Sequence, residues 1–190
     1  MARALVTGSG ERVRAIAGLL EKEGHEVLTA ASPAALDALG DLSDVAYYVQ
    51  LPSRVQPVGT TLVGRVRSFL TDGLLARYAV VERVLPALAE GASVVLVSGN
   101  TADGVMPDDA RSRLALLHVL AHATRAEAGS RGVSVMVAGG ARDDDELAGY
   151  ALRGGEDPTT RLVGQSADTV TDEQYQDWRT ETMGLAAGLA

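Results

Sequence analysis

The sequence predicts one α/β domain, built on a doubly wound parallel sheet with helices on both faces. Two runs rich in Val, at residues 93–97 and 133–138, are typical of strands that are buried on both faces. Helical patterns separate the apolar runs along the chain, and this alternation indicates right-handed crossovers between parallel strands. A chain of 190 residues, of which 46% are hydrophobic, is long enough for one domain with one core.

The first third of the chain has the pattern of a strand, a helix and a second strand. An apolar run at 4–7 ends in a turn, Gly8-Ser9-Gly10. Residues 11–23 are expected to be helical, because apolar side chains recur on one helical face at Val13, Ile16, Ala17 and Leu20. Gly24 ends this helix, and residues 26–30 have the pattern of the second strand.

The middle of the chain alternates in the same way. Ser32-Pro33 has the residue types of a helix N-cap and first turn, so a short helix is expected from there to about residue 39. A strand at 45–51 follows. A long helical stretch at 62–89, broken near Thr71-Asp72-Gly73, then precedes the buried strand at 93–97.

The last third continues with a helix at 108–129 and a strand at 133–138. The helix expected at 143–152 has an acidic first turn, which suits the positive end of a helix dipole. A last strand is expected at 162–165, and a final helix in the tail at 171–190. The chain is thus expected to form about six strands within one domain spanning residues 1–190.

Composition and charge exclude several classes of function. Because the chain has no Cys, disulfides, thiolate catalysis and Cys-ligated zinc are excluded. The net charge of −8 argues against binding to nucleic acid or to an anionic membrane surface. No apolar run approaches the ~20 residues of a membrane span, and residues 1–6 enter a strand with no space for a signal peptide. We therefore expect a cytoplasmic protein.

Four stretches of the chain, in the right order, resemble the short-chain dehydrogenase/reductase (SDR) family. They are the glycine loop Leu5-Val6-Thr7-Gly8-Ser9-Gly10, the helix end Val84-Leu85-Pro86-Ala87-Leu88, the strand at 94–98 and the helical run Ser112-Arg113-Leu114-Ala115-Leu116-Leu117. Residues 162–165 are similar to the family's last strand. The chain is shorter than is usual for the family, because one strand and one helix are missing between the second strand and the strand at 45–51.

This resemblance implies a fold, a cofactor and a partner. The fold would be a single Rossmann-like domain, and the cofactor would be NAD(P). The partner would be a second copy of the chain, in a homodimer or tetramer formed through the helices at about 62–89 and 108–129. A catalytically complete SDR paralogue is an alternative partner.

The glycine loop departs from the family's TGxxxGxG pattern. Thr7-Gly8 is kept, but Glu11 and Val13 stand where the later glycines belong. Those glycines normally let the backbone approach a pyrophosphate, and a carboxylate beside them repels it. The residues that would bind the cofactor, if it binds, are Thr7, Gly8, Ser9, Gly10 and Arg12, with Arg12 alternatively a solvated charge on the outer face of its helix.

The end of the second strand gives no support for a tight cofactor site. Residues 30–32 offer neither an acid for a ribose 2′-hydroxyl nor an Arg for a 2′-phosphate. On the residues alone we name no cofactor. The resemblance alone implies NAD(P), and the altered glycine loop predicts that this cofactor binds weakly.

The catalytic positions of the family are replaced. Its chemistry needs a Tyr acid, a Lys four residues on that lowers the pKa of this Tyr, a Ser and usually an Asn. The matching positions here are Asp109, Arg113, Ser98 (or Gly99) and Gly73. Arg113 stays protonated and cannot relay a proton, and Asp109 carries a resting negative charge. An Asp–Arg pair at this spacing also has a simpler interpretation, a helix-stabilising ion pair worth about 0.2–0.5 kcal/mol.

Three weaker candidate sites remain in the sequence. His118 and His122 have a possible zinc-ligand spacing, but no third ligand follows the HExxH pattern, and paired interfacial histidines are the simpler interpretation. Ser98 lacks the nucleophile elbow of a Ser-His-Asp hydrolase. The acidic run at 142–146 follows a strand end and would suit a cation, or else is a solvated loop and first helical turn. We predict no metal site.

Taken together, these residues favour a catalytically inactive SDR-like protein that acts as a ligand-binding, scaffolding or regulatory module. The joint loss of the Tyr and the Lys is the feature that carries this hypothesis. The alternative is an atypical NAD(P)-dependent oxidoreductase with displaced catalytic residues, for which Tyr78, Ser98 and Arg113 are the candidates.

Overall fold

The computed structural model describes residues 1–40, 42–52, 58–99, 107–140 and 142–154. For residues 74 and 107–115 it describes the backbone alone. Its centre is a parallel sheet with the strand order β2-β1-β3-β4-β5. The strands are β1 (Arg3–Thr7), β2 (Glu26–Ala30), β3 (Val45–Gln50), β4 (Leu88–Val97) and β5 (Ser134–Ala138). The predicted parallel α/β fold is confirmed. The described part of the chain holds five strands, and the sixth strand expected at 162–165 and the tail helix at 171–190 lie outside it.

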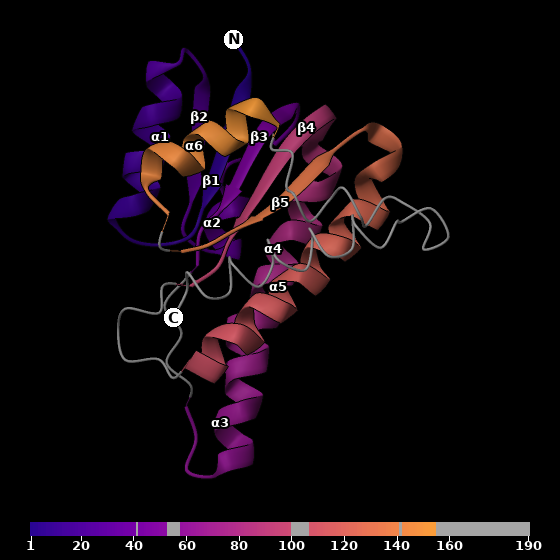
Figure 1. The fold of residues 1–190 in the computed structure, drawn as a ribbon. Coiled ribbons are helices and arrows are strands. Elements are labelled where there is room, and N and C mark those ends of the chain that lie inside the picture. Colours follow the sequence, from indigo (N-terminus) through magenta and orange to yellow (C-terminus); the bar gives the residue numbers. More distant parts are fainter. Residues whose placement is uncertain (41, 53–57, 100–106, 141, 155–190) are drawn as a thin grey trace, which may run out of the picture.

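Helices cover both faces of this sheet, as Figure 1 shows. On one face, α1 (Glu11–Lys22) and α6 (Asp144–Arg153) pack against alternate residues of the strands. On the other face lie α2 (Pro33–Asp37), α4 (Ala76–Val84) and α5 (Pro107–Ala128). Because successive side chains of a strand point to opposite faces, Ala4 and Val6 join the first layer and Leu5 joins the second. The predicted double winding is confirmed.

The order in which strands are added to the sheet reverses beside β1. The chain runs from β1 through α1 to β2 at the sheet edge, and α2 then leads back across β1 to β3. The N-cap of α2 is Ser32, whose hydroxyl accepts a hydrogen bond from the Ala35 N–H at 3.1 Å. Only residues 38–44 connect α2 to β3. The reversal therefore places a topological switch point between the carboxyl ends of β1 and β3.

The helical stretch expected at 62–89 is shorter and less regular than predicted. It consists of α3 (Leu62–Ser68), a π-helical segment (Phe69–Leu75), α4 and a 3₁₀ turn (Leu85–Ala87). The π-helical segment is the predicted break, and it contains Gly73. Pro86 lies in the 3₁₀ turn, where its missing N–H prevents the α-helix from continuing.

Strand β4 begins five residues earlier than expected, at Leu88 rather than Ser93. Leu88 pairs with Val45, and Ser93 pairs with Tyr47, so four residues of β4 stand opposite Ala46 alone. This bulge includes exposed Glu90 and Gly91, the latter with φ of 70°. Its polar residues hide the strand pattern in the sequence. Among the helices that the structure describes, none has the length and apolarity needed to cross a membrane.

Candidate functional site

A cleft opens at the switch point, over the carboxyl ends of β1, β2 and β3. It contains about 430 Å³ of empty space, including open solvent at its mouth. Thr7 ends β1 and Gly8 follows it, Ala30 ends β2 before residues 31–33, and Gln50 ends β3 before Leu51. The fourth side comes from the π-helical segment and α4, through Asp72, Gly73, Ala76, Arg77 and Val80. Open α/β sheets bind their ligands at this place.

Gly8 holds the first strand end close to the third. Its φ is 129°, and a Cβ added at this position would lie 2.8 Å from both the Cβ and the carbonyl oxygen of Leu51. The Gly8 N–H donates to the carbonyl oxygen of Ala30 at 3.0 Å. Only glycine fits here, so this part of the predicted cofactor loop is built by backbone contact.

The rest of the loop is open to solvent. Ser9 and Gly10 are exposed, and Gly10 is the N-cap of α1 with φ of 101° and no side-chain cap. A Cβ on Gly10 would meet nothing within 4 Å. The first N–H groups of α1 therefore remain accessible to an anion, although Glu11 places a carboxylate in the same turn.

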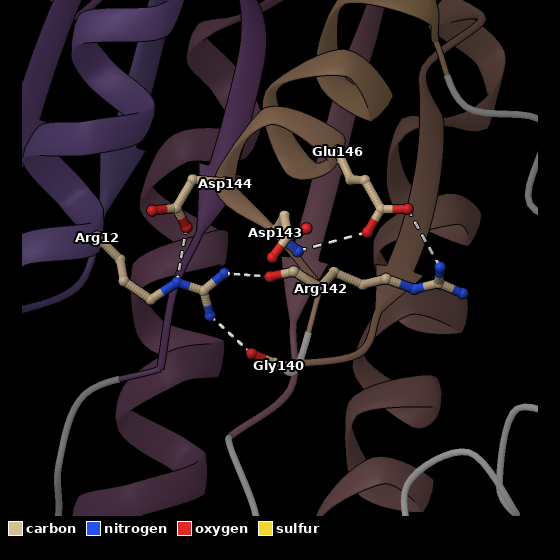
Figure 2. Close-up of polar contacts among 6 residues, drawn as sticks. All are labelled: Arg12, Gly140, Arg142, Asp143, Asp144 and Glu146. Carbon is tan, nitrogen blue, oxygen red and sulfur yellow. Dashed lines mark hydrogen bonds and ion pairs between the residues drawn. The ribbon is translucent and has the colours of Figure 1, made fainter.

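Arg12 is held by the protein itself (Figure 2). Its Nε donates to Oδ1 of Asp144 at 2.7 Å, Nη1 donates to the carbonyl oxygen of Gly140 at 2.7 Å, and Nη2 donates to the carbonyl oxygen of Arg142. These bonds join α1 to the loop between β5 and α6. The interpretation of Arg12 as a solvated charge is wrong, because three acceptors engage its guanidinium. These bonds use three of its five N–H donors, so a phosphate at Arg12 would find two.

The acidic run at 142–146 is also used structurally. Asp143 and Glu146 form a capping box at the start of α6, and Glu146 additionally accepts a hydrogen bond from Arg142 at 3.3 Å (Figure 2). Asp144 pairs with Arg12. Within the described ranges, no group of three His, Asp or Glu side chains is arranged to hold a metal ion. His118 is half-buried and His122 is exposed on α5, without a third ligand among those residues.

A buried polar cluster that the sequence analysis did not predict lies at the floor of the cleft. The hydroxyl groups of Thr7 and Tyr48 share a hydrogen bond of 3.0 Å. The Gln50 side chain clamps Arg77 from both ends, because its Nε2 donates to the Arg77 carbonyl oxygen at 3.1 Å and its Oε1 accepts from Arg77 Nε at 3.0 Å. The only signals in the sequence are a Gln at the end of an apolar strand and an Arg within a mostly apolar stretch.

Burial shifts the proton affinities of this cluster. It raises the pKa of Tyr48 to about 12, a shift that the hydrogen bond to Thr7 and the charge of Arg77 partly oppose. It lowers the pKa of Arg77 to about 10, and the nearby tyrosines Tyr48 and Tyr78 oppose that shift. At neutral pH Tyr48 is thus an uncharged phenol and Arg77 a cation, set side by side below the cleft.

Of the residues at the family's catalytic positions, the structure describes the surroundings of Ser98 and Gly73 only. Ser98 is only 6% exposed, and its Oγ accepts a hydrogen bond from the Gly140 N–H at 2.9 Å. Gly73 lines the cleft but has no side chain. Asp109 and Arg113 lie on α5, and their side chains fall outside the described part of the structure.

Tyr78, the acid of the alternative hypothesis, also has a structural partner. Its hydroxyl donates to the carbonyl oxygen of Leu116 on α5 at 2.9 Å. Burial raises the pKa of Tyr78, and the charge of Arg77 opposes this shift. A phenol with a raised pKa and an occupied donor is poorly suited to protonate a carbonyl substrate.

The fold is similar to that of solved SDR structures. The sequence matches no family model and no curated protein. The short-chain dehydrogenase/reductase from Serratia marcescens superposes with a TM-score of 0.56 at 17% identity, over 80% of this chain and 88% of that one. BdcA (YjgI) from E. coli gives a TM-score of 0.53 at 16% identity, over 82% and 90% of the two chains. The protein lin1944 from Listeria innocua gives 0.54 at 16% identity, over 73% and 77%. At these identities the likeness concerns the fold, which is SDR-like as the sequence motifs predict.

Proposed function

We propose that this SDR-like chain binds a nucleotide in the switch-point cleft and does not carry out the carbonyl reduction or alcohol oxidation of the family. The observation that carries the proposal is that the two halves of the carboxyl edge of the sheet differ. The β1–β2–β3 side is an open cleft. At the β4–β5 side the Ser98 side chain is buried and accepts a hydrogen bond from the Gly140 N–H.

The proposed loss of chemistry follows from the charges at the replaced positions. Reduction of a carbonyl needs a proton donor whose pKa lies near the working pH. Asp109 offers a carboxyl group where the family has a phenol, and an arginine such as Arg113 cannot relay a proton as a lysine does. Ser98 is only 6% exposed, so a substrate carbonyl would have little access to the hydroxyl proton that must polarise it.

The cleft fits a full NAD(P) only in part. Thr7, Gly8 and the open N-terminus of α1 suit a nucleotide phosphate. Residues 30–33, however, present no carboxylate to a ribose, and Glu11 repels a pyrophosphate. We therefore expect NAD(P)H to bind weakly and a smaller nucleotide to use the same cleft.

The proposal is tested by measuring binding and turnover together. Isothermal titration with NADPH, NADH and adenine mononucleotides should show binding that Ala31→Trp weakens, because Ala31 lines the cleft. Ala38→Trp is the matched control, since Ala38 is an exposed residue just after α2 and does not line the cleft. A carbonyl panel with NADPH should give no turnover. Turnover that Asp109→Asn or Arg113→Met abolishes would contradict the proposal.

We also propose a second copy of the chain as partner. The exposed face of α3 carries Leu62 and Val63, each 70% exposed, and Val66, 49% exposed. Figure 1 shows α3 extending away from the sheet, in the direction of the N-terminal end of α5. An apolar helix face of this kind is typical of an interface. A second copy offers the same face by symmetry, whereas an SDR paralogue would need a matching one.

A further inference from the structure

We propose that Arg77 binds the phosphate of the ligand in this cleft, so that the ligand class is a nucleoside monophosphate rather than a neutral nucleoside. This inference rests on the proposed function. It adds a phosphate site that is separate from the N-terminus of α1, because Arg77 comes from α4 on the opposite side of the cleft.

The argument begins with the donors of the guanidinium. An arginine has five N–H donors. In Arg77 the Nε donor goes to Gln50 Oε1, and Nη2 donates to the carbonyl oxygens of Val97 at 2.8 Å and Gln50 at 3.4 Å. The structure shows no acceptor for Nη1 among the residues it describes. Two donors on one nitrogen atom are therefore left for a ligand.

Nη1 is the part of the Arg77 guanidinium that is left for a ligand. It is not among the buried side-chain atoms without a partner that the described part of the protein holds. Because Arg77 lines the cleft, we infer that Nη1 faces it.

The charge of Arg77 has no counter-charge in the described part of the protein. Four other arginines, namely Arg3, Arg12, Arg83 and Arg142, each pair with a carboxylate. The acceptors around Arg77 are neutral carbonyl oxygens. Asp72, which also lines the cleft, accepts a hydrogen bond from the Ser68 hydroxyl at 2.9 Å and forms no ion pair with Arg77 there. A ligand phosphate would supply the missing negative charge.

The guanidinium is also held in place before a ligand arrives. Gln50 is 2% exposed and contacts Arg77 with both ends of its amide, and the Val97 carbonyl fixes Nη2. Fixing a long side chain in advance lowers the entropy cost of binding. The facing wall at Ala30, Ala31, Pro33 and Leu51 is apolar, as is Val80 on α4 near Arg77, and these side chains suit the base of a nucleoside.

The test compares ligands with and without the phosphate. Adenosine, AMP and inorganic phosphate are titrated calorimetrically, at matched ionic strength, into the wild type and Arg77→Met. The net charge of −8 repels anions at long range, so a preference for AMP must come from a local group. We expect AMP to bind the wild type roughly tenfold or more tighter than adenosine. Arg77→Met should remove this preference and leave adenosine binding unchanged.

A second variant keeps the test valid if Arg77→Met does not fold. Ala31→Asp places a carboxylate on the exposed rim of the cleft without touching the Arg77 contacts, and Ala38→Asp is its control outside the cleft. Ala31→Asp should weaken AMP several-fold against adenosine, and Ala38→Asp should behave as the wild type does.

The outcomes separate the two proposals. If adenosine and AMP bind equally, or if Arg77→Met keeps the AMP preference, the Arg77 inference is overturned and the nucleotide site stands. If neither nucleoside nor nucleotide binds, the proposed function fails. In that case a thermal shift by inorganic phosphate that requires Arg77 would still support the anion site, and its absence would overturn that site as well.

Discussion

Arg12 on α1 donates from Nε to Oδ1 of Asp144 at the start of α6, at a distance of 2.7 Å. The two residues are 132 positions apart in the sequence, and their helices pack on the same face of the sheet. The two backbone carbonyls that share the guanidinium, those of Gly140 and Arg142, belong to the loop between β5 and α6. Arg12 thus joins the first helix of the fold to the last one that the structure describes.

We predict that Arg12→Met destabilises the protein by about 2 kcal/mol, because it removes three hydrogen bonds from one guanidinium. The ion pair itself contributes the smaller part, since its two side chains are 35% and 29% exposed. Urea unfolding followed by circular dichroism measures the difference. Arg14→Met is the control, because Arg14 is exposed on the same helix and should change stability little. Equal effects of the two variants would show that the hydrogen bonds of Arg12 do not stabilise the fold.

Gly8→Ala should destabilise the protein by about 2 kcal/mol or more, because its Cβ would lie 2.8 Å from the Leu51 backbone and the φ of 129° is strained for alanine. Gly18→Ala is the opposite control. Gly18 lies inside α1, where an added Cβ meets nothing within 4 Å, so alanine should stabilise by about 0.5–1 kcal/mol. Thermal unfolding of both variants checks the contrast, and a stable Gly8→Ala protein would contradict the close approach of β1 and Leu51.

Ser98→Ala should lower the free energy of unfolding by about 1–2 kcal/mol, because it leaves the buried Gly140 N–H without its acceptor. Nucleotide affinity should stay unchanged if Ser98 has a structural role. Calorimetric titration beside urea unfolding separates these two readouts. A loss of affinity at unchanged stability would instead place Ser98 in the ligand site.

The fold was largely predictable from the sequence, since its signals are local. Val-rich runs and one-sided helices at 11–23 and 143–152 are each visible within a single element, and all of the described strands were expected. The exception is the first half of β4. Its bulge around Glu90 and Gly91 breaks the apolar pattern of the strand. The sequence therefore predicts a helical stretch that runs to residue 89, although β4 already begins at Leu88.

The candidate site was less predictable, because its contacts join residues that are distant in the sequence. Gln50 and Arg77 are 27 positions apart, and their meeting depends on the return of the chain across β1. The sequence around Arg12 predicts a phosphate contact or a solvated charge, because its partner Asp144 lies 132 residues further on, after the fifth strand. Thr7 and Gly8 of the glycine loop line the cleft, and their role in binding a cofactor stays a prediction.

The buried phenol of Tyr48 predicts a loss of stability at alkaline pH. Its pKa is raised from 10.0 to about 12 by burial, so the folded state binds the proton more tightly than the unfolded state does. The stabilisation is complete below pH 10 and is lost as the pH rises through 12, by roughly 2–3 kcal/mol in total. Arg77, whose pKa is lowered to about 10, contributes with the opposite sign in the same window.

Tyr48→Phe isolates the tyrosine contribution, because Arg77 is present in both proteins. At neutral pH this variant should be less stable by about 1 kcal/mol, since the Thr7 hydroxyl loses its partner. Between pH 10 and 12 its stability should fall less steeply than that of the wild type. Urea unfolding at a series of pH values measures both slopes, with Tyr47→Phe as a half-buried control. Parallel slopes would contradict the raised pKa.

The apolar face of α3 predicts the oligomeric state. Val66→Glu, combined with Val63→Glu, should convert a dimer or tetramer into a monomer, because desolvating carboxylates at the interface costs several kcal/mol without partners. Sedimentation velocity across a concentration series measures the change. Thr71→Glu is a suitable control, because Thr71 is an exposed polar residue of the neighbouring π-helical segment. A wild-type chain that sediments as a monomer at all concentrations would contradict the homodimer. Recovery of a stable complex only with an SDR paralogue would assign the same face to that partner, since the variants would then abolish the mixed complex instead.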